Sequence, residues 1–241
     1  MEIAVIGGTG LLGSRLVKEL RVRGHNVRSL SRRSSQYSVD LDTGAGLEES
    51  ISGCDIVINA ANDSTRNAAA VLAGGTRRLA EAARRTNIKH HLCVSVVGSA
   101  EMPLCYFRTK REQELEAERG GCPWTILRST QFDEMLAQTF SRLGAVGLIP
   151  LPEGKVQPVA VLEVARTIAD LAEGEPHNGY VTMAGPRIRT IRECARDWKV
   201  QEHQQRIILP IPLPGKLGKA LRRGVLTCPS PDVVGRSRFA S

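Results

Sequence analysis

The sequence of 241 residues predicts an α/β fold, a doubly wound parallel sheet with a small C-terminal lobe that covers the substrate side. Two observations support this fold class. Short apolar runs rich in β-branched residues alternate with longer stretches of helical periodicity, which is typical of parallel strands joined by helices. The first such run, residues 2–6, also stops at a glycine-rich turn, and apolar residues at helical spacing follow it.

The opening stretch carries the strongest motif in the chain. Gly8, Gly10 and Gly13 match the pattern G-x-G-x-x-G between a strand and a helix, the context in which this pattern is specific. A turn this tight needs residues without a Cβ. The helix after it directs unpaired N–H groups and its positive dipole end at a pyrophosphate. The stretch therefore predicts a nucleotide site, and the alternative is a βα turn that is glycine-rich for packing alone.

Length and composition predict one globular domain. We expect a single domain over residues 1–241, with 1–150 forming mainly the dinucleotide-binding core and 151–241 mainly the substrate-side lobe and C-terminal segment. No apolar run approaches the length of a membrane span. The first strand begins at residue 2, which leaves no room for a signal peptide. These features predict a cytoplasmic protein without membrane contact.

Cysteine and charge patterns argue against two other classes of protein. The six cysteines are scattered, with no C-x-x-C and no histidine cluster at ligand spacing, so we expect reduced thiols and no metal site. The net charge of +8 permits nucleic-acid binding, but the arginines are spread over expected helices. Only four Phe and three Tyr are available for base stacking. We therefore expect a small-molecule substrate and no nucleic-acid partner.

The second expected strand, residues 25–31, ends in a basic loop rich in hydroxyl groups. A unit that binds NAD(H) would place an Asp or Glu about 20 residues past the glycines, on the ribose hydroxyls. Here Arg32 and Arg33 follow Ser31 instead, and a planar cation beside hydroxyl donors suits a 2′-phosphate. The loop predicts NADP(H) as the cofactor, and the alternative is a solvated arginine pair.

The next elements follow in order. We expect a short strand at 39–41, a helix at 46–52 and a strand at 55–61, whose small final residues leave room for a flat ligand. A helix over 67–86 is expected to break or shift at its two adjacent glycines, before a strand at 91–97. The later elements expected are a helix at 111–119, a strand at 124–128, a helix at 161–173, a strand at 180–183, and helices at 190–199 and 216–223.

A second informative stretch opens the helix after the fifth expected strand. Tyr106 and Lys110 are four residues apart, so on a helix they share one face. An ammonium close to a phenol lowers the pKa of the phenol and favours its proton transfer. Four carboxylates further along this helix are expected to form a solvated face: Glu112, Glu114, Glu116 and Glu118.

Three motifs together resemble the NmrA-like proteins of the atypical short-chain dehydrogenase/reductase family. They are the turn at residues 7–13, Tyr106-x-x-x-Lys110, and the segment Leu127-Arg128-Ser129-Thr130-Gln131-Phe132. Residues 157–165 add to the resemblance, which covers nearly the whole chain and is closest to bacterial NAD(P)H-binding oxidoreductases. The resemblance implies a Rossmann-like fold and a bound nicotinamide dinucleotide.

The resemblance also implies where the dinucleotide lies. It places residues 9–12 at the pyrophosphate, the arginine pair near the 2′-phosphate, residues 40–41 beside the adenine, residues 60–62 along the adenosine, and Lys110 on the nicotinamide ribose. The cofactor-binding residues expected are Gly7, Thr9, Gly10, Leu11, Leu12, Gly13, Ser31, Arg32, Arg33, Asp40, Leu41, Ala60, Ala61, Asn62 and Lys110.

One position departs from the wider superfamily. Its dehydrogenases hold the substrate carbonyl with a serine late in the fifth strand, and here Val96 or Val97 stands at that place. Ser95 or Ser99 are the substitutes. The catalytic residues expected are therefore Tyr106, Lys110 and Ser95, and the substrate pocket is expected to include Ser99, Thr130, Gln131 and Phe132.

These features predict an NADPH-dependent oxidoreductase that reduces a carbonyl or enone of a small organic molecule. Tyr106 would donate the proton, while Lys110 lowers the pKa of its phenol and anchors the ribose. One alternative is a redox sensor that binds NADP(H) without turnover, which the missing strand-end serine motivates. Another is an isomerase or epimerase that keeps the dinucleotide bound.

Overall fold

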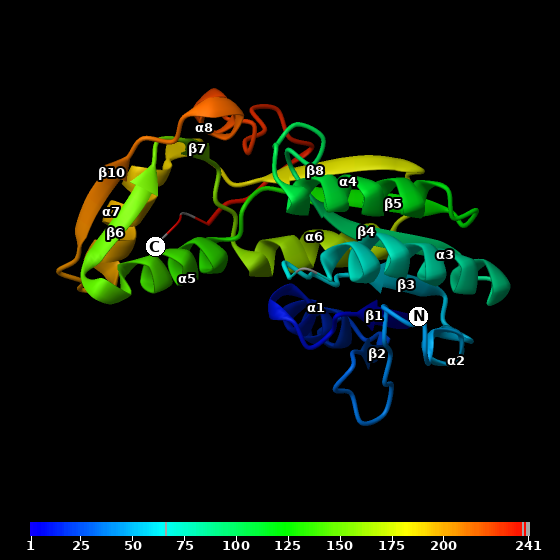
Figure 1. Ribbon diagram of the computed structural model, residues 1–241. Helices are drawn as coiled ribbons and strands as arrows, with labels where there is room; N and C mark the ends of the chain where they lie inside the picture. Colours follow the sequence, from blue (N-terminus) through cyan, green and yellow to red (C-terminus); the bar gives the residue numbers. More distant parts are fainter. Residues whose placement is uncertain (66, 238, 240–241) are drawn as a thin grey trace. The chain divides into compact units, whose positions relative to one another are not determined.

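The computed structural model describes residues 1–65, 67–237 and 239 (Figure 1). The chain forms two compact units, and each is assembled from three separate segments of sequence. Unit 1 consists of Met1–Ser95, Arg108–Arg128 and Ala165–Val181, and unit 2 consists of Val96–Phe107, Ser129–Val164 and Thr182–Ser241.

A seven-stranded sheet lies mainly in unit 1; three of its strands continue into unit 2, and its edge strand at residues 233–234 lies wholly in unit 2. In chain order its strands are β1 (Glu2–Ile6), β2 (Asn26–Leu30), β3 (Ile56–Asn59), β4 (His90–Val96), β5 (Trp124–Ser129), β8 (Gly179–Ala184) and β11 (Val233–Val234). Their order in the sheet is β11-β8-β5-β4-β3-β1-β2. The pairs β1–β2, β1–β3, β3–β4 and β8–β11 are parallel, and the predicted doubly wound parallel sheet is confirmed.

The first strand is buried as its sequence predicts. Ile3, Ala4 and Val5 have no exposed surface, because β1 lies between two neighbours and is covered on both faces. Burial of one such aliphatic side chain stabilises the fold by about 1.5–3 kcal/mol. This strand therefore fixes the position of the glycine turn that follows it.

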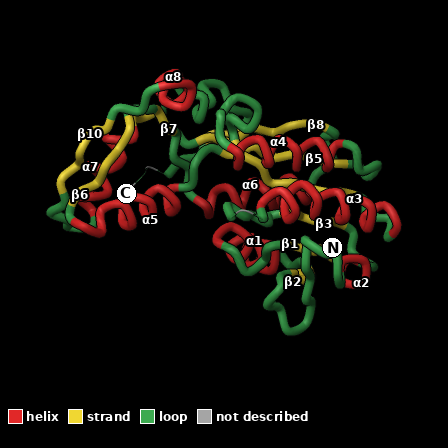
Figure 2. The backbone as a smooth tube through the Cα atoms, in the orientation of Figure 1, coloured by secondary structure: helices red, strands yellow, loops and turns green. Residues whose placement is uncertain are grey.

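Helices connect the strands of unit 1 (Figure 2). They are α1 (Leu11–Val22), α2 (Leu47–Ile51), the π-helix η1 (Ala69–Gly74), α3 (Gly75–Arg85), α4 (Cys105–Glu118) and α6 (Val161–Glu173), of which α4 and α6 continue into unit 2. Arg23 after α1 donates to Asp170 at 2.7 Å and to Glu173 at 2.9 Å, so α1 is tied to α6. The change from π-helix to α-helix at Gly75 confirms the predicted shift.

The strand predicted at residues 39–41 is wrong. Asp40 accepts a hydrogen bond from the N–H of Asp42 at 3.0 Å, and its own N–H donates to the carbonyl of Ala45. Gly44 and Gly46 then adopt positive φ values of 84° and 76°, which reverse the chain. The segment is a loop, and an isolated bridge joins Ser38 to Ser31 at the end of β2.

Among its described residues, unit 2 wholly contains two small sheets, three α-helices and one 3-10 helix. The elements are α5 (Asp133–Leu143), the 3-10 helix η2 (Gly144–Val146), β6 (Leu148–Pro152), β7 (Lys155–Val156), β9 (Arg189–Thr190), α7 (Ile191–Gln201), β10 (Ile207–Ile211) and α8 (Gly215–Arg223). Strands β6 and β10 pair in parallel, and β7 and β9 pair antiparallel. Phe140, Trp198 and Phe239 pack together in its core. No helix in the described part of the chain is both long enough and apolar enough to cross a membrane.

Candidate functional site

The glycine turn after β1 is held against the end of β2. The N–H groups of Gly7 and Gly8 donate to the carbonyl of Leu30 at 2.9 and 3.2 Å. The N–H of Gly10 then donates back to the carbonyl of Gly7 at 2.9 Å. Gly7 has a φ of 74°, which favours glycine at this position. Two backbone hydrogen bonds therefore hold the turn against the end of β2, and a third closes the turn itself.

Close packing explains why positions 13 and 8 are glycines. A Cβ on Gly13 would lie 2.1 Å from the carbonyl oxygen of Gly7, so α1 reaches the turn only because this side chain is absent. A Cβ on Gly8 would lie 2.4 Å from Oγ of Ser29 in β2. The motif predicted from sequence thus forms a cradle that side chains would fill.

The start of α1 is open to an anion. Gly10 is its N-cap and provides no side-chain cap, and the first turn carries no acidic residue. The first N–H groups of a helix have no intrahelical acceptor, and they suit a pyrophosphate. Strand β1 lies between β2 and β3, so the turn stands where the strand order reverses. Ligands of doubly wound sheets bind at this switch point.

The loop after β2 adds the groups expected at a 2′-phosphate. Oγ of Ser31 is buried and has no hydrogen-bond partner in the described part of the chain. Arg32 and Arg33 are exposed, and neither forms an ion pair with another described residue. Because Leu30 binds the glycine turn directly, these residues lie beside the cradle. The donors present fit an anionic dinucleotide.

The loop after β3 forms another wall of the cradle. Asn59 is fully buried; its Nδ2 donates to Oγ1 of Thr76 at 2.8 Å, and its Oδ1 accepts the N–H of Ala61 at 3.2 Å. A Cβ on Gly7 would lie 3.0 Å from Ala60, which shows how closely the two loops approach. Sequence reasoning missed Asn59, although an amide at the end of a buried strand was a signal for it.

The other residues expected around the cofactor differ in exposure. Thr9, Gly10 and Asn62 are exposed, and Leu11 is half-buried. Leu12 and Leu41 are core residues with 6% exposure each. Their side chains are therefore buried, and a ligand would contact their backbone instead.

Lys110 is buried at the boundary between α4 and β4. Its Nζ donates to the carbonyl of Val94 at 2.7 Å and to Oε1 of Gln113. Burial lowers the pKa of this ammonium, while Cys93 and Glu114 act in the opposite direction. Tyr106 is half-buried on the first turn of α4 and packs edge-on against Phe107 at 5.4 Å. Tyr106 belongs to unit 2 and Lys110 to unit 1.

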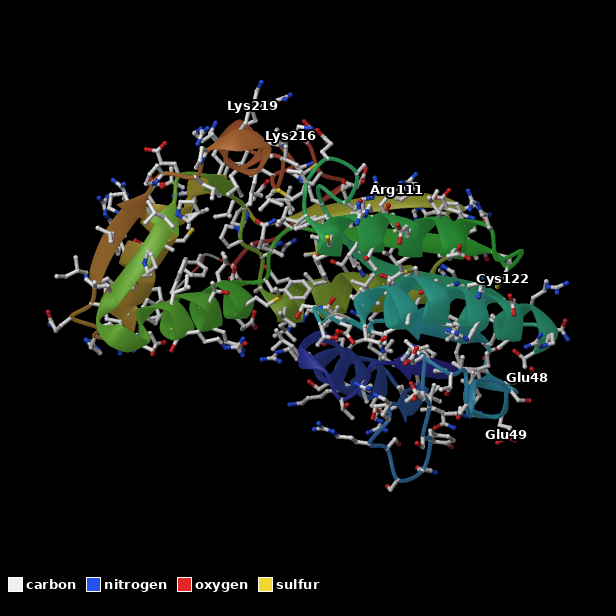
Figure 3. All side chains as sticks on the ribbon, in the orientation of Figure 1. Glu48, Glu49, Arg111, Cys122, Lys216 and Lys219 are labelled. Carbon is white, nitrogen blue, oxygen red and sulfur yellow. The ribbon has the colours of Figure 1, made fainter. Side chains whose placement is uncertain are left out.

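Ser95 belongs to a buried polar network in unit 1. Its hydroxyl donates to Oε1 of Glu114 at 2.6 Å, and both side chains are buried. Arg128 also donates to the Glu114 carboxylate through Nε at 2.9 Å and Nη2 at 2.6 Å. Arg111, labelled in Figure 3, adds a bond of 2.9 Å. The expectation that Glu114 lies on a solvated face is wrong. Its side chain is buried, and hydrogen bonds from these three donors compensate its carboxylate for the loss of water.

The charge of Glu114 is stabilised in this network. Burial raises the pKa of the carboxyl, but hydrogen bonds from Arg128, Ser95 and Arg111 outweigh burial and lower the pKa overall. The guanidinium of Arg128 also lies 3.8 Å from the ring centroid of Tyr180, a cation–π contact.

The residues expected at the substrate pocket lie in unit 2, and two of them bind backbone groups. Oγ1 of Thr130 accepts the N–H of Gly185 at 3.3 Å. Gln131 donates to the carbonyl of Leu226 at 2.9 Å and accepts the N–H of Gln157 at 3.2 Å. These two side chains join distant segments of the unit.

Ser99 and Phe132 complete the set of expected pocket residues. Ser99 is buried, and Phe132 is half-buried and bridges to Val159.

Asp133, which the sequence did not single out, follows the expected pocket residues. Its Oδ1 is buried and has no hydrogen-bond partner among the described residues. Burial, together with Glu134 and Glu163, raises the pKa of Asp133 to about 7. In the described part of the chain, no group of three or more His, Cys, Asp or Glu is arranged to hold a metal ion.

The glycine cradle, the open start of α1 and the topology define a dinucleotide-binding protein with a Rossmann-like fold. Residues 7–174 match the model of the NAD(P)H-binding family, and the chain belongs to this family. Its cofactor is a nicotinamide dinucleotide, and the resemblance inferred from the motifs is confirmed.

Relatives and solved structures place the chain among proteins of varied activity. An NAD(P)H azoreductase of Xenophilus azovorans is 26% identical over 212 residues, which cover 80% of this chain and 71% of the azoreductase. The photosystem II assembly factor Ycf39 of Trieres chinensis is 26% identical over 156 residues, which cover 58% of this chain and 49% of Ycf39. The aligned part therefore spans about half the length of that protein.

A solved NADPH complex of a quinone oxidoreductase from Escherichia coli shares the fold, with a TM-score of 0.80, 17% identity and coverage of 99% of this chain and 97% of the other.

Proposed function

We propose that the protein is an NADPH-dependent oxidoreductase that reduces a carbonyl or enone of a small organic molecule. The observation that carries the proposal is the cradle in unit 1, with a buried hydroxyl at the end of β2 and two arginines that have no ion-pair partner among the described residues. That donor set favours a 2′-phosphate, and so NADP(H) over NAD(H). The azoreductase relative is consistent with a reductase.

Different residues of the chain would bind the different parts of the cofactor. The turn at residues 7–13 and the start of α1 bind the pyrophosphate, and Arg32 and Arg33 bind the 2′-phosphate. Ala60 to Asn62 flank the adenosine, and Asp40 lies by the adenine. Lys110 has two of its three N–H bonds placed on Val94 and Gln113, which leaves the third for a ribose hydroxyl.

The residue proposed to transfer the proton, Tyr106, lies on α4. A reduced nicotinamide, when bound, would supply the hydride for the reduction. Tyr106 donates its phenolic proton to the carbonyl oxygen, and solvent returns a proton to Tyr106 after the alcohol leaves. Ser95 is the remaining candidate for a hydroxyl beside the carbonyl.

One observation favours a second function, a redox sensor that binds NADP(H) without turnover. The hydroxyl of Ser95 donates to Glu114 at 2.6 Å inside a buried network, so using it for a substrate would break a charge-assisted hydrogen bond. Val96 and Val97, which follow it, carry no polar side-chain group.

A substrate panel separates the two functions. The full chain is incubated with NADPH and a series of aldehydes, ketones, enones and quinones, and the nicotinamide absorbance and the products are measured. For a reductase, at least one compound oxidises NADPH with matching product, and Tyr106→Phe lowers the turnover by at least about 100-fold. The affinity of the variant for NADPH should stay unchanged, which serves as the control.

Two results would contradict the proposed reductase. Turnover that survives Tyr106→Phe would remove the assigned proton donor. NADPH binding without oxidation by any compound of the panel would favour the sensor.

A further inference from the structure

A cavity of about 340 Å³ lies within unit 2, whereas every residue assigned to the cofactor belongs to unit 1. Its lining includes three cationic side chains, Lys155, Arg192 and Arg222, and one carboxylate, Glu153. The charges on its wall therefore leave an excess of two positive charges. A concave site with an excess of one charge concentrates ions of the opposite sign.

The backbone explains why these cations gather. Lys155 in β7 pairs with Thr190 in β9, and Arg192 stands two residues further, in the first turn of α7. A Cβ on Gly154 would lie 3.0 Å from both Ile191 and Leu221. The turn before β7 thus packs tightly against the start of α7 and the end of α8, which carries Arg222.

The three cationic groups of the cavity differ in ion pairing from their neighbour Arg189. Among the described residues, no carboxylate lies within ion-pair distance of Lys155, Arg192 or Arg222. By contrast, the neighbouring Arg189 pairs with Asp197 at 2.7 Å. Arg222 donates to a backbone carbonyl, that of Leu213, at 3.3 Å. Further positive charge stands on α8, where Lys216 and Lys219 project from the helix in Figure 3.

The chemistry of the wall narrows the class of ligand. Guanidinium and ammonium groups together are typical of phosphate recognition. The cavity is in the size range of small-molecule sites and is larger than a phosphate ion needs. The carboxylate of Glu153 can only accept hydrogen bonds, so it repels a phosphate but suits hydroxyl groups.

We infer that this cavity binds a hydroxylated phosphate ester, with its phosphate between Lys155, Arg192 and Arg222 and its hydroxyl groups toward Glu153. The inference does not depend on the proposed reaction, because ligand binding here is measured without nicotinamide cofactor.

Isothermal titration calorimetry of the full chain with glucose 6-phosphate tests the inference. Saturable binding is expected, and Lys155→Gln and Arg192→Gln should each weaken it at least about tenfold. Arg196→Gln is the matched control, since Arg196 is exposed on α7 and does not line the cavity. It should change the affinity by less than about twofold. Circular dichroism confirms that each variant is folded, and Arg222→Gln provides a further variant.

Comparison ligands complete the test. Glucose should not bind, and inorganic phosphate should bind at least about tenfold more weakly than the ester. Replacement of both Arg32 and Arg33 by alanine should leave the affinity for the ester unchanged.

Several results would overturn the inference. These are the absence of binding by the wild type, an equal loss in Arg196→Gln, equal affinity for inorganic phosphate, and loss of binding in the Arg32/Arg33 variant.

Discussion

Removal of the Glu114 carboxylate should destabilise the fold strongly. The side chain has no exposed surface and accepts hydrogen bonds from Ser95, Arg128 and Arg111. In Glu114→Ala the two guanidinium groups can be partly rehydrated, because Arg128 and Arg111 retain 26% and 34% exposure. The hydroxyl of Ser95 is buried and cannot be rehydrated in the same way. Breaking a buried ion pair costs about 3–5 kcal/mol, and we expect a loss of that size in the free energy of unfolding.

Urea unfolding followed by circular dichroism measures this loss. Glu114→Gln keeps the shape and one acceptor for Ser95, so it should lose less stability, about 1–3 kcal/mol. Glu112→Ala on the exposed side of the same helix is the control, and a change within about 0.5 kcal/mol is expected. A loss below about 1 kcal/mol for Glu114→Ala, or a loss equal to that of the control, would refute the reasoning.

Two further predictions concern pH and the cradle. Burial lowers the pKa of both His90 and His91 to about 4. The unfolded chain therefore binds more protons between about pH 6.5 and 4, and stability should fall as the pH drops through this range, by about 3 kcal/mol per histidine. His91→Leu should make the measured fall shallower, and an unchanged slope would contradict this assignment. Gly13→Ala should abolish measurable dinucleotide binding, because the new Cβ would lie 2.1 Å from the backbone oxygen of Gly7. Gly174→Ala is the control and should bind the dinucleotide normally, because its Cβ would have its nearest contact at 3.6 Å. Normal binding by Gly13→Ala in a dinucleotide titration would show that the turn is not the site.

Local patterns predict most of the helices and strands of unit 1. The buried strands, the glycine turn and the helical periodicities are encoded within short windows, and Val161–Glu173 was predicted with its observed bounds. The cradle could be predicted because a glycine pattern between a strand and a helix is itself a local signal. Residues 39–41 were predicted wrongly because the side chain of Asp40 competes with extended pairing by forming its own turn.

Unit 2 was harder to predict because its contacts connect distant segments. Strands β6 and β10 contain prolines, which obscure the strand pattern, and they pair only with each other across more than 50 residues. In unit 1, the sequence around Glu114 likewise predicts an exposed side chain, whereas hydrogen bonds from Arg128, 14 residues away, stabilise its buried carboxylate. Long-range ion pairing of this kind leaves no trace in a local pattern.

The affinity of the wild-type chain for NADPH and NADH, measured side by side by calorimetry at one ionic strength, tests the central claim most directly. The loop after β2 predicts that NADPH binds at least about tenfold more tightly, and that replacing both Arg32 and Arg33 by alanine largely removes the difference. Equal affinities in the wild type, or a preference that survives the double replacement, would contradict the assignment of this cradle to NADP(H).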